Sequence, residues 1–294
     1  MRAGPFDRLH RIDSMARVAV VGSYGVGLTV ELARMPAAGE TVVGRSFRVD
    51  HGGKGSNQAI GAARLGAHVD FLTAIGGDAF GHDAIALWQA EGVDARPVIT
   101  DAPTMTAPIL VEPTGENRIV VVPGALERLA PEHVDAFSDR IAAADVCVVQ
   151  LEIPVWTALY ALEVAAAAGV RTILNPAPAP PEPIAPHCDY VTPNETEAPA
   201  VRDANATLVL TLGDEGAELR GERVPAFAAS VVDTTGAGDA FTAAFAVALA
   251  EGCDEREAVR WGCAAGAHMV EHSGVVPGLP TRDQLERRLQ SALV

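Results

Sequence analysis

Short apolar runs alternate with longer Ala-rich segments along most of the chain. The runs rich in Val, Ile and Leu have the length and composition of buried strands: residues 16–24, 69–76, 145–152, 170–176, 188–195 and 207–213. The longer segments, most of them Ala-rich, have the length and composition of helices: residues 56–66, 79–91, 131–143, 154–168, 239–251, 254–272 and 281–291. This order of strands and helices predicts an α/β fold, with a parallel sheet that helices cover on both faces. Ligands of such folds bind at the carboxyl ends of the strands.

Two segments break this order. Residues 39–50 alternate apolar and polar positions with a period of two, and residues 108–122 have the pattern of a hairpin that turns at 114–117. Both patterns predict a small, separate β-sheet, with an edge extension of the main sheet as the alternative. Half-buried strands inserted into an α/β protein suit a lid that closes over a substrate and excludes water.

Composition and charge narrow the class of protein. The 294 residues are 49% hydrophobic and 5% aromatic, which suits one large or two unequal α/β domains. The formal net charge of −16 opposes binding to nucleic acids and to anionic membranes, and no basic patch offsets it. We therefore expect neither a nucleic-acid partner nor a membrane partner.

The cysteines and the first residues bear on localisation. The four cysteines, Cys147, Cys188, Cys253 and Cys263, form no Cys-x-x-Cys pair. Three of them lie within apolar runs, so we expect buried free thiols in a reducing cytoplasm. No apolar run reaches the roughly 18 residues that span a bilayer. Residues 1–14 lack the hydrophobic core of a signal peptide, and we expect them to form a disordered tail.

The stretch DTTGAGDAF at residues 233–241 places two aspartates around a glycine-rich turn. Gly236 and Gly238 permit the turn, and Asp239 begins an apolar helix whose N-terminal N–H groups can bind an anion. A carboxylate there can accept the proton of an alcohol while the N–H groups hold the charge of a transferred phosphoryl group. The alternative is that Asp239 is only a helix N-cap, but a cap requires neither Asp233 nor the glycines.

A second glycine-rich stretch, HGGKGSNQA at residues 51–59, precedes another predicted helix. Gly52 and Gly53 allow a close backbone approach, and Lys54 and Asn57 carry hydrogen-bond donors. The stretch is not a Walker A loop, because glycine follows the lysine where that motif has Ser or Thr. Taken alone, it is weak evidence for a site.

Together the two stretches resemble the two signatures of the PfkB carbohydrate kinases, most closely the ribokinase-like members. GGKGSNQA, with ARLGA and IGGD after it, is similar to the first signature, and DTTGAGDAF is similar to the second. The order typical of the family also holds for PAAGETVVG before the first signature and for VVQLE, LNPAPA, VTPNETEA and LTLGDEG between the two. The resemblance therefore runs over residues 16–291. It implies a three-layer α/β/α fold with a small β-sheet lid. The kinase domain would cover residues 15–294, with lid segments at about 28–50 and 106–123.

The resemblance implies an activity and site residues. The activity is ATP-dependent phosphorylation of a primary hydroxyl of a sugar, by a homodimer that forms through the lid. Asp239 corresponds to the catalytic base, and the amides of Gly236, Ala237 and Gly238 correspond to the anion hole. The sugar site corresponds to Gly52, Gly53, Lys54, Asn57 and Glu152. The nucleotide site corresponds to Asn194, Thr211, Gly213 and Gly216. Glu197 completes an Asn-x-x-Glu motif that organises Mg²⁺ through waters. Asp233, Thr235 and Gly274 correspond to a K⁺ site.

The chain departs from the family pattern at the sugar end. Ribokinase-like kinases carry Asn-x-Asp after the first strand to hold sugar hydroxyls, whereas this chain has Gly25 and Gly27. Each unpaired group costs about 1–3 kcal/mol, so ribose itself does not follow from the resemblance. The space left suits a bulkier or less polar substrate, lined by Tyr24. Gly278 replaces a serine near the cation, which makes K⁺ activation a weaker expectation than Mg²⁺ dependence, and residues 199–205 replace a longer connection.

Two other functions are compatible with these motifs. A nucleoside kinase is the nearest alternative, because the same fold serves nucleosides and the two glycines enlarge the sugar end. A catalytically silent sensor of sugars or nucleotides is the alternative from another class, although a sensor needs no base beside an anion hole. His268 and His272 have a spacing that can bind metal, but a partly buried helix face explains them better.

Overall fold

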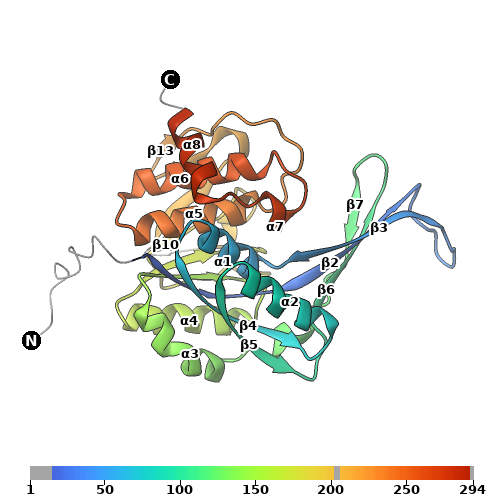
Figure 1. The fold of residues 1–294 in the computed structure, drawn as a ribbon, viewed down its shortest axis with the longest axis horizontal. Coiled ribbons are helices and arrows are strands. Elements are labelled where there is room, and N and C mark those ends of the chain that lie inside the picture. Colours follow the sequence, from blue (N-terminus) through green and yellow to red (C-terminus); the bar gives the residue numbers. More distant parts are fainter. Residues whose placement is uncertain (1–14, 202–205, 292–294) are drawn as a thin grey trace, which may run out of the picture.

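The computed structural model describes residues 15–201 and 206–291. Residues 1–14, for which we expect a tail, and residues 202–205, in the short connection, lie outside the described residues. The described chain forms a layered body from which a small sheet projects to one side (Figure 1).

The body is built around a nine-stranded sheet in the order β13-β12-β11-β10-β9-β8-β1-β4-β5. Its strands are β1 (Arg17–Val21), β4 (His68–Gly76), β5 (Val93–Thr100), β8 (Val146–Gln150), β9 (Arg171–Asn175), β10 (Tyr190–Val191), β11 (Thr207–Thr211), β12 (Ala217–Leu219) and β13 (Glu222–Val224). In this order, the strands from β11 to β5 run parallel to one another, and β12 and β13 add an antiparallel edge. The predicted, mostly parallel sheet is confirmed.

Helices cover both faces of this sheet, which confirms the three-layer fold. Their bounds are α1 (Lys54–Arg64), α2 (Ala79–Ala90), α3 (Pro131–Ala143), α4 (Val155–Ala167), α5 (Ala237–Ala250), α6 (Glu255–Met269), α7 (Val275–Gly278) and α8 (Arg282–Ser291). Short 3₁₀ turns lie at η1 (Gly124–Arg128), η2 (Ala198–Ala200) and η3 (Gly213–Glu215).

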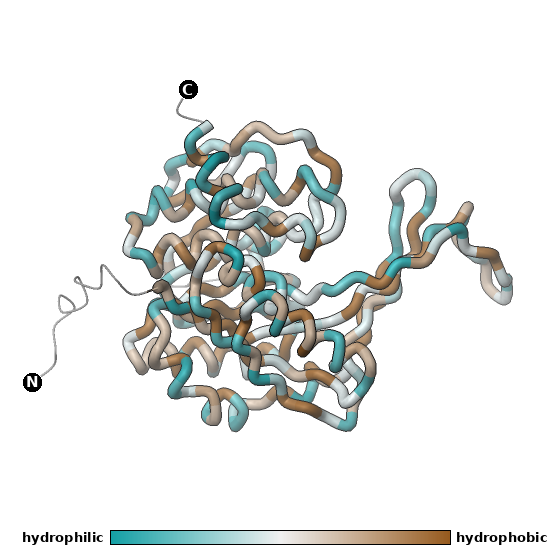
Figure 2. Tube along the Cα trace, in the orientation of Figure 1, coloured by the Kyte–Doolittle hydropathy of each residue, from teal (hydrophilic) through white to brown (hydrophobic). Residues whose placement is uncertain are grey.

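The central strands, such as β1 and β8, are mostly apolar because both of their faces are buried. In β1, Val18 and Val20 pack with α1, α5 and α6, whereas Ala19 and Val21 belong to the core beneath α3 and α4. Side chains alternate between the two faces of a strand, so a continuous apolar run supplies both cores. The hydrophobic trace through the centre of the body follows these strands (Figure 2).

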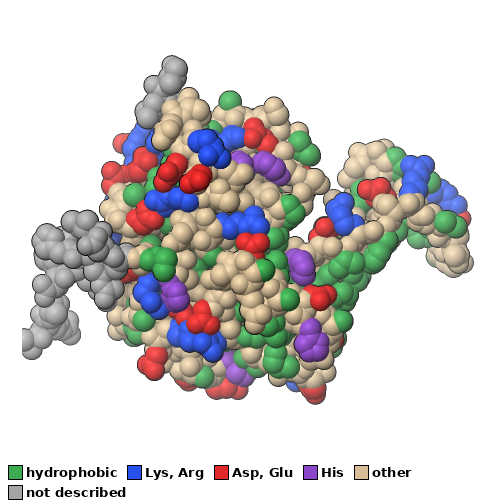
Figure 3. Space-filling view, in the orientation of Figure 1, with side chains coloured by type: hydrophobic (Ala, Val, Ile, Leu, Met, Phe, Trp, Pro, Cys, Tyr) green, Lys and Arg blue, Asp and Glu red, His purple; other side chains and the backbone are tan. Residues whose placement is uncertain are grey.

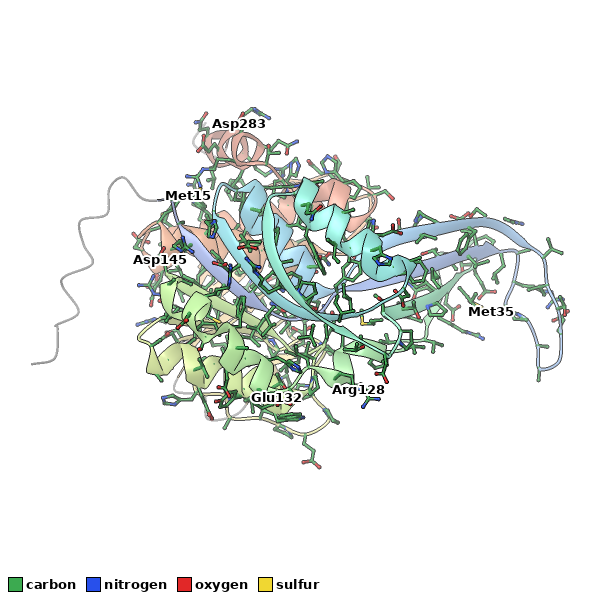
Figure 4. All side chains as sticks on the ribbon, turned by 60° about the horizontal axis from the view of Figure 1, so that its bottom comes forward. Met15, Met35, Arg128, Glu132, Asp145 and Asp283 are labelled. Atoms are coloured by element: carbon green, nitrogen blue, oxygen red, sulfur yellow. The ribbon has the colours of Figure 1, made fainter. Side chains whose placement is uncertain are left out.

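The small sheet has the order β3-β2-β6-β7. Its strands are β2 (Gly25–Leu32), β3 (Gly44–Gly52), β6 (Met105–Val111) and β7 (Asn117–Ile119). Strands β2 and β6 are parallel, and the other two pairs are antiparallel. A separate small sheet and the predicted hairpin are thus confirmed, and the alternative of an edge extension is wrong. In Figure 4, Met35 lies near the far end of this projection, while Arg128 and Glu132 lie on the body.

Candidate active site

A glycine turn with room for an anion, residues 236–238, opens α5, and we call it the anion turn. Gly236 precedes the helix with φ of 83°, a left-handed conformation that favours glycine. No side chain caps the first turn of α5. A Cβ on Gly238 would meet no atom within 4 Å. Uncapped N–H groups beside open space are the arrangement that binds anions at a helix N-terminus.

The carboxylate of Asp239, in that first turn, is held by two amides from α1. Asn57 Nδ2 donates to Oδ2 over 2.8 Å, and Gln58 Nε2 donates to Oδ1 over 2.9 Å. Asp239 is only 5% exposed. The two contacts therefore fix the orientation of a nearly buried carboxylate beside the glycine turn.

A second layer of buried amides holds Gln58. Gln150 Nε2 at the end of β8 donates to Gln58 Oε1 over 2.6 Å. Asn175 Oδ1 at the end of β9 accepts from Gln58 Nε2 over 3.2 Å. These three amides are not among the site residues that the sequence predicts. The sequence feature that could have identified them is the presence of polar side chains at the ends of apolar strands and within an Ala-rich helix.

The side-chain oxygen of Asn57 is a buried hydrogen-bond acceptor. Its Oδ1 has no hydrogen-bond partner in the part of the chain that the structure describes. Nearly all buried polar atoms in proteins are paired, so an orphaned acceptor beside a carboxylate indicates a place for a ligand donor such as a hydroxyl.

Lys54 begins α1 among acidic side chains. Its N–H donates to Glu152 Oε2 over 2.8 Å, and the Ser23 hydroxyl donates to the same oxygen. Burial alone would lower the pKa of Lys54, but the charges of Asp239, Glu152 and Glu197 hold that pKa above its usual value. The motif lysine therefore stays cationic close to three carboxylates that are far apart in the sequence.

Asn194 and Glu197 form one closed turn. Asn194 N–H donates to Glu197 Oε2 over 3.0 Å, and Glu197 N–H donates to Asn194 Oδ1 over 2.9 Å. Burial raises the pKa of Glu197, and the charge of Asp239 adds to this effect. A bound cation would stabilise the ionised form of Glu197 and so oppose both effects on its pKa. One carboxylate without a full protein cage suits a hydrated Mg²⁺ that takes its other ligands from phosphates, and no cluster of three or more potential metal ligands occurs within residues 15–201 and 206–291.

The other predicted nucleotide and cation positions lie on adjoining loops. Thr211 ends β11 and pairs with Asn194, and two glycines with positive φ follow it, Gly213 at 59° and Gly216 at 96°. Asp233 Oδ1 accepts from Thr235 N–H over 2.9 Å, just before the anion turn.

Gly274 brings a second loop to the same turn. It precedes α7 with φ of 81°, and the next residue, Val275, lies so close that a Cβ on Gly236 would be 2.7 Å from its Cγ1. The structure thus gathers most of the residues that the sequence suggested around the start of α5.

One face of the small sheet is turned toward this turn, and we call it the inner face. Strand register and alternation place these side chains on it: Gly25, Gly27, Arg48, Asp50, Gly52, Met105, Ala107 and Ile109. The hydrogen bond to Asp50 raises the pKa of Arg48, and the charge of Asp233 contributes. Arg48 is therefore close to the loop that leads to the anion turn. Figure 3 shows the hollow between the small sheet and the body.

A family model described as pfkB family carbohydrate kinase matches residues 15–282. The chain belongs to the pfkB family of carbohydrate kinases. The ribokinase of Bacillus subtilis (strain 168) is 38% identical over 293 residues, which cover 94% of this chain and 100% of that protein. The deoxyribokinase of Salmonella typhi is 32% identical over 300 residues, which cover 92% of this chain and 98% of that protein. A solved structure of Arabidopsis thaliana ribokinase, complexed with ribose and ATP, has a TM-score of 0.85 at 31% identity and covers 94% of this chain and 99% of that one.

The ribokinase-like fold and the motifs of this pfkB kinase agree with these relatives. The protein is therefore an ATP-dependent carbohydrate kinase. Every helix in the described part of the chain is too short or too polar to cross a lipid bilayer.

Two expectations for the sugar end of this kinase need correction. Tyr24 exposes none of its surface, and its hydroxyl bonds His51 Nδ1 at 2.7 Å, so it has no surface with which to line the sugar end. Burial raises the pKa of this tyrosine. The space left by Gly25 is also not open, because a Cβ there would lie 2.2 Å from Met105 Cε. The glycines therefore do not enlarge the site at this position.

Proposed function

We propose that this pfkB kinase transfers the γ-phosphoryl group of ATP to a primary hydroxyl of a sugar, with Asp239 as the base. The observation that carries the proposal is the pairing of Asn57 and Asp239. The carboxylate and the orphaned Asn57 Oδ1 offer two acceptors next to an uncapped helix N-terminus. A sugar hydroxyl there has a group to take its proton and an anion site for the phosphoryl group.

The proposed reaction has one chemical step. Asp239 accepts the proton of the hydroxyl, the sugar oxygen bonds to the γ-phosphorus, and the bond between that phosphorus and the β–γ bridging oxygen breaks to release ADP. The amides of Gly236, Ala237 and Gly238 donate to the transferred phosphoryl oxygens. Gly236 is preorganised, because it already has the left-handed conformation that the turn requires. The Ala237 N–H donates to Thr234 O over 3.3 Å and would exchange this contact for a phosphoryl oxygen.

The sugar would be held by the start of α1 and its neighbours. The backbones of Gly52 and Gly53 allow close approach, Lys54 and Asn57 supply polar contacts, and Glu152 accepts from a hydroxyl. Support for Glu152 is its fixed position, since Ser23 and the Lys54 N–H both bond one oxygen.

The nucleotide would lie along the loops after β10 and β11, near Asn194, Thr211, Gly213 and Gly216. Glu197, through waters, would hold Mg²⁺, which neutralises charge on the phosphates during transfer. Support comes from the raised pKa of Glu197 and from its electrostatic coupling to Asp239. Asp233, Thr235 and Gly274 would approach K⁺ beside the anion turn.

The small sheet would act as a lid and as the contact between two copies of the chain. Its outer face, opposite the inner face, carries exposed apolar side chains, among them Phe47 at 65%, Val49 at 48% and Val120 at 61%. A contiguous apolar surface of this kind is typical of protein interfaces. Phe47→Asp should therefore convert a dimer to a monomer in light scattering, and an unchanged mass would contradict this contact.

ATP as phosphoryl donor and four free cysteines support a cytoplasmic location.

A coupled ADP-release assay over pentoses, hexoses, deoxysugars and nucleosides, with Mg²⁺ and with or without K⁺, tests the proposed activity. Phosphorus NMR of the product then identifies the phosphorylated carbon. We expect a sugar to drive ADP release and the phosphate to sit on its primary carbon. Release of ADP with nucleosides but no sugar would overturn the proposed substrate class.

A further inference from the structure

Met105 occupies the place of a side chain that Gly25 lacks. The two residues are paired across β2 and β6, so their Cβ positions lie on the same face. A Cβ built on Gly25 would be 2.2 Å from Met105 Cε, 3.0 Å from Cγ and 3.1 Å from Cβ. Asparagine therefore does not fit at position 25 unless the methionine moves. At this point of the inner face, an amide is replaced by a thioether and a methyl group.

Asp50 occupies a corresponding place beside Gly27. These residues are paired across β2 and β3, and a Cβ on Gly27 would be 4.0 Å from Asp50 Cβ. The Asp50 side chain is 35% exposed and accepts from Arg48 Nε. A carboxylate is therefore still present on this part of the inner face, but it comes from the next strand. The amide at position 25 has no such substitute, because Gly52, on the other side of Gly25, has no side chain.

Met105 forms an apolar wall at this point of the inner face and leaves no opening there. The residue is 6% exposed and packs into the core beneath α3 and α4. Farther along the inner face, Ala107 pairs with Gly27, and Ile109 Cδ1 would lie 3.6 Å from a Cβ on Gly27. A hydroxyl pressed against this wall would lose its water without gaining a partner.

We propose that Met105 determines the substrate of this kinase, and that the substrate is a deoxysugar. The sugar carbon that faces Met105 carries hydrogen instead of a hydroxyl, while Asp50 accepts from a remaining hydroxyl. This inference rests on the proposed kinase function and names its substrate class. A nucleoside fits less well, because Met105 fills the space that the two glycines would otherwise have opened.

The test uses pairs of sugars that differ by a single hydroxyl, D-ribose against 2-deoxy-D-ribose and D-glucose against 2-deoxy-D-glucose. The measured quantity is the ratio of kcat/KM for the deoxysugar to that for its parent sugar. In the wild type we expect a ratio of about 10 to 100 for one of the two pairs, the range by which an apolar wall discriminates against an added hydroxyl. A ratio near one or below in both pairs overturns the inference.

Variants separate a specificity role from a structural one. The double variant Gly25→Asn/Met105→Gly restores the amide and removes the methyl group, and it should lower the ratio at least tenfold. Met105→Leu keeps the wall apolar and should keep the preference for the deoxysugar. Gly25→Asn alone should be the poorest enzyme for both sugars, because the asparagine collides with Met105. A structural role alone would change the rate for both sugars equally and leave the ratio unmoved.

The outcomes distinguish this inference from the proposed function. Turnover of sugars with a ratio that the double variant leaves unchanged contradicts the inference, whereas the kinase function stands. A nucleoside that outperforms every sugar also contradicts it. Failure of all sugars and nucleosides to drive ADP release in every variant contradicts both.

Discussion

Asn57 Nδ2 lies 2.8 Å from Asp239 Oδ2, although the two residues are 182 positions apart in the chain. This contact joins the start of α1 to the start of α5, and with it the two glycine-rich stretches of the sequence. Each stretch alone is compatible with an ordinary helix start. Together they place a fixed carboxylate, an orphaned amide oxygen and an uncapped helix N-terminus at one point.

Gln58 is predicted to position Asp239 without touching the substrate. Gln58→Leu has a similar size but removes the donor to Asp239 Oδ1 and the acceptor of Gln150. We expect kcat to fall about 10- to 100-fold with KM for the sugar changed less than threefold, because misplacement of a catalytic group costs rate rather than binding. Steady-state kinetics measure both. Gln89→Leu, on the exposed side of α2, is the matched control, and a wild-type kcat in Gln58→Leu would contradict the positioning role.

Glu197 is predicted to set the affinity for Mg²⁺. Glu197→Gln keeps the size of the side chain and its contact with Asn194 but removes the charge. We expect the free Mg²⁺ concentration for half-maximal rate to rise about tenfold or more, and a chelator to stop the wild type entirely. Glu195→Gln, on the exposed side of the same turn, should leave this concentration unchanged. Identical Mg²⁺ titrations for Glu197→Gln and the wild type would be incompatible with the proposed role.

Gly236 and Gly238 should respond to alanine with opposite signs. At Gly236, alanine would adopt φ of 83° and place Cβ 2.7 Å from Val275, which should cost about 1–2 kcal/mol or more in the free energy of unfolding. At Gly238, inside α5 with no atom within 4 Å of the new Cβ, alanine should stabilise by about 0.5–1 kcal/mol. Urea denaturation of both variants checks the prediction. Equal effects would mean that the turn does not hold the conformation described.

The stability of the protein should fall between pH 6.5 and pH 4 because of His268. Burial lowers the pKa of His268 to about 4, with the charge of His272 contributing. The folded pKa is below that of the unfolded chain, so the unfolded chain binds more protons in this window. The stabilisation is complete above about pH 6.5 and is lost as the pH falls toward 4.

His268→Gln should therefore flatten the dependence of unfolding free energy on pH. Urea denaturation at pH 7.5 and pH 5 measures it, with the exposed His82→Gln as control. A slope in His268→Gln as steep as in the wild type would assign the effect to other groups.

The local sequence is sufficient to predict most elements of the body and the anion turn. Strands such as β8 and helices such as α3 have continuous apolar runs or Ala-rich segments, and Gly236 lies where the turn needs a positive φ. Strand β2 was not predicted as a strand of the small sheet, because Gly25 and Gly27 weaken its pattern. The partly exposed edge strand β5 was missed as well, since Pro97 interrupts it.

The parts of the site that the sequence could not predict depend on contacts between distant segments. Met105 fills the place beside Gly25 only because β6 pairs in parallel with β2. Gln150 reaches Gln58 only because α1 packs over the end of β8. Such contacts are set by the tertiary packing of whole elements, and no local pattern encodes them.

The most direct measurement is the single-turnover rate of phosphoryl transfer in Asp239→Asn, with ATP and sugar binding followed by calorimetry. Asparagine preserves the size of the side chain but cannot accept the proton as a carboxylate does. We predict a rate lower by about 10²- to 10⁴-fold, with both dissociation constants within a few-fold of the wild type. Transfer at the wild-type rate in Asp239→Asn would contradict the assignment of this carboxylate as the base.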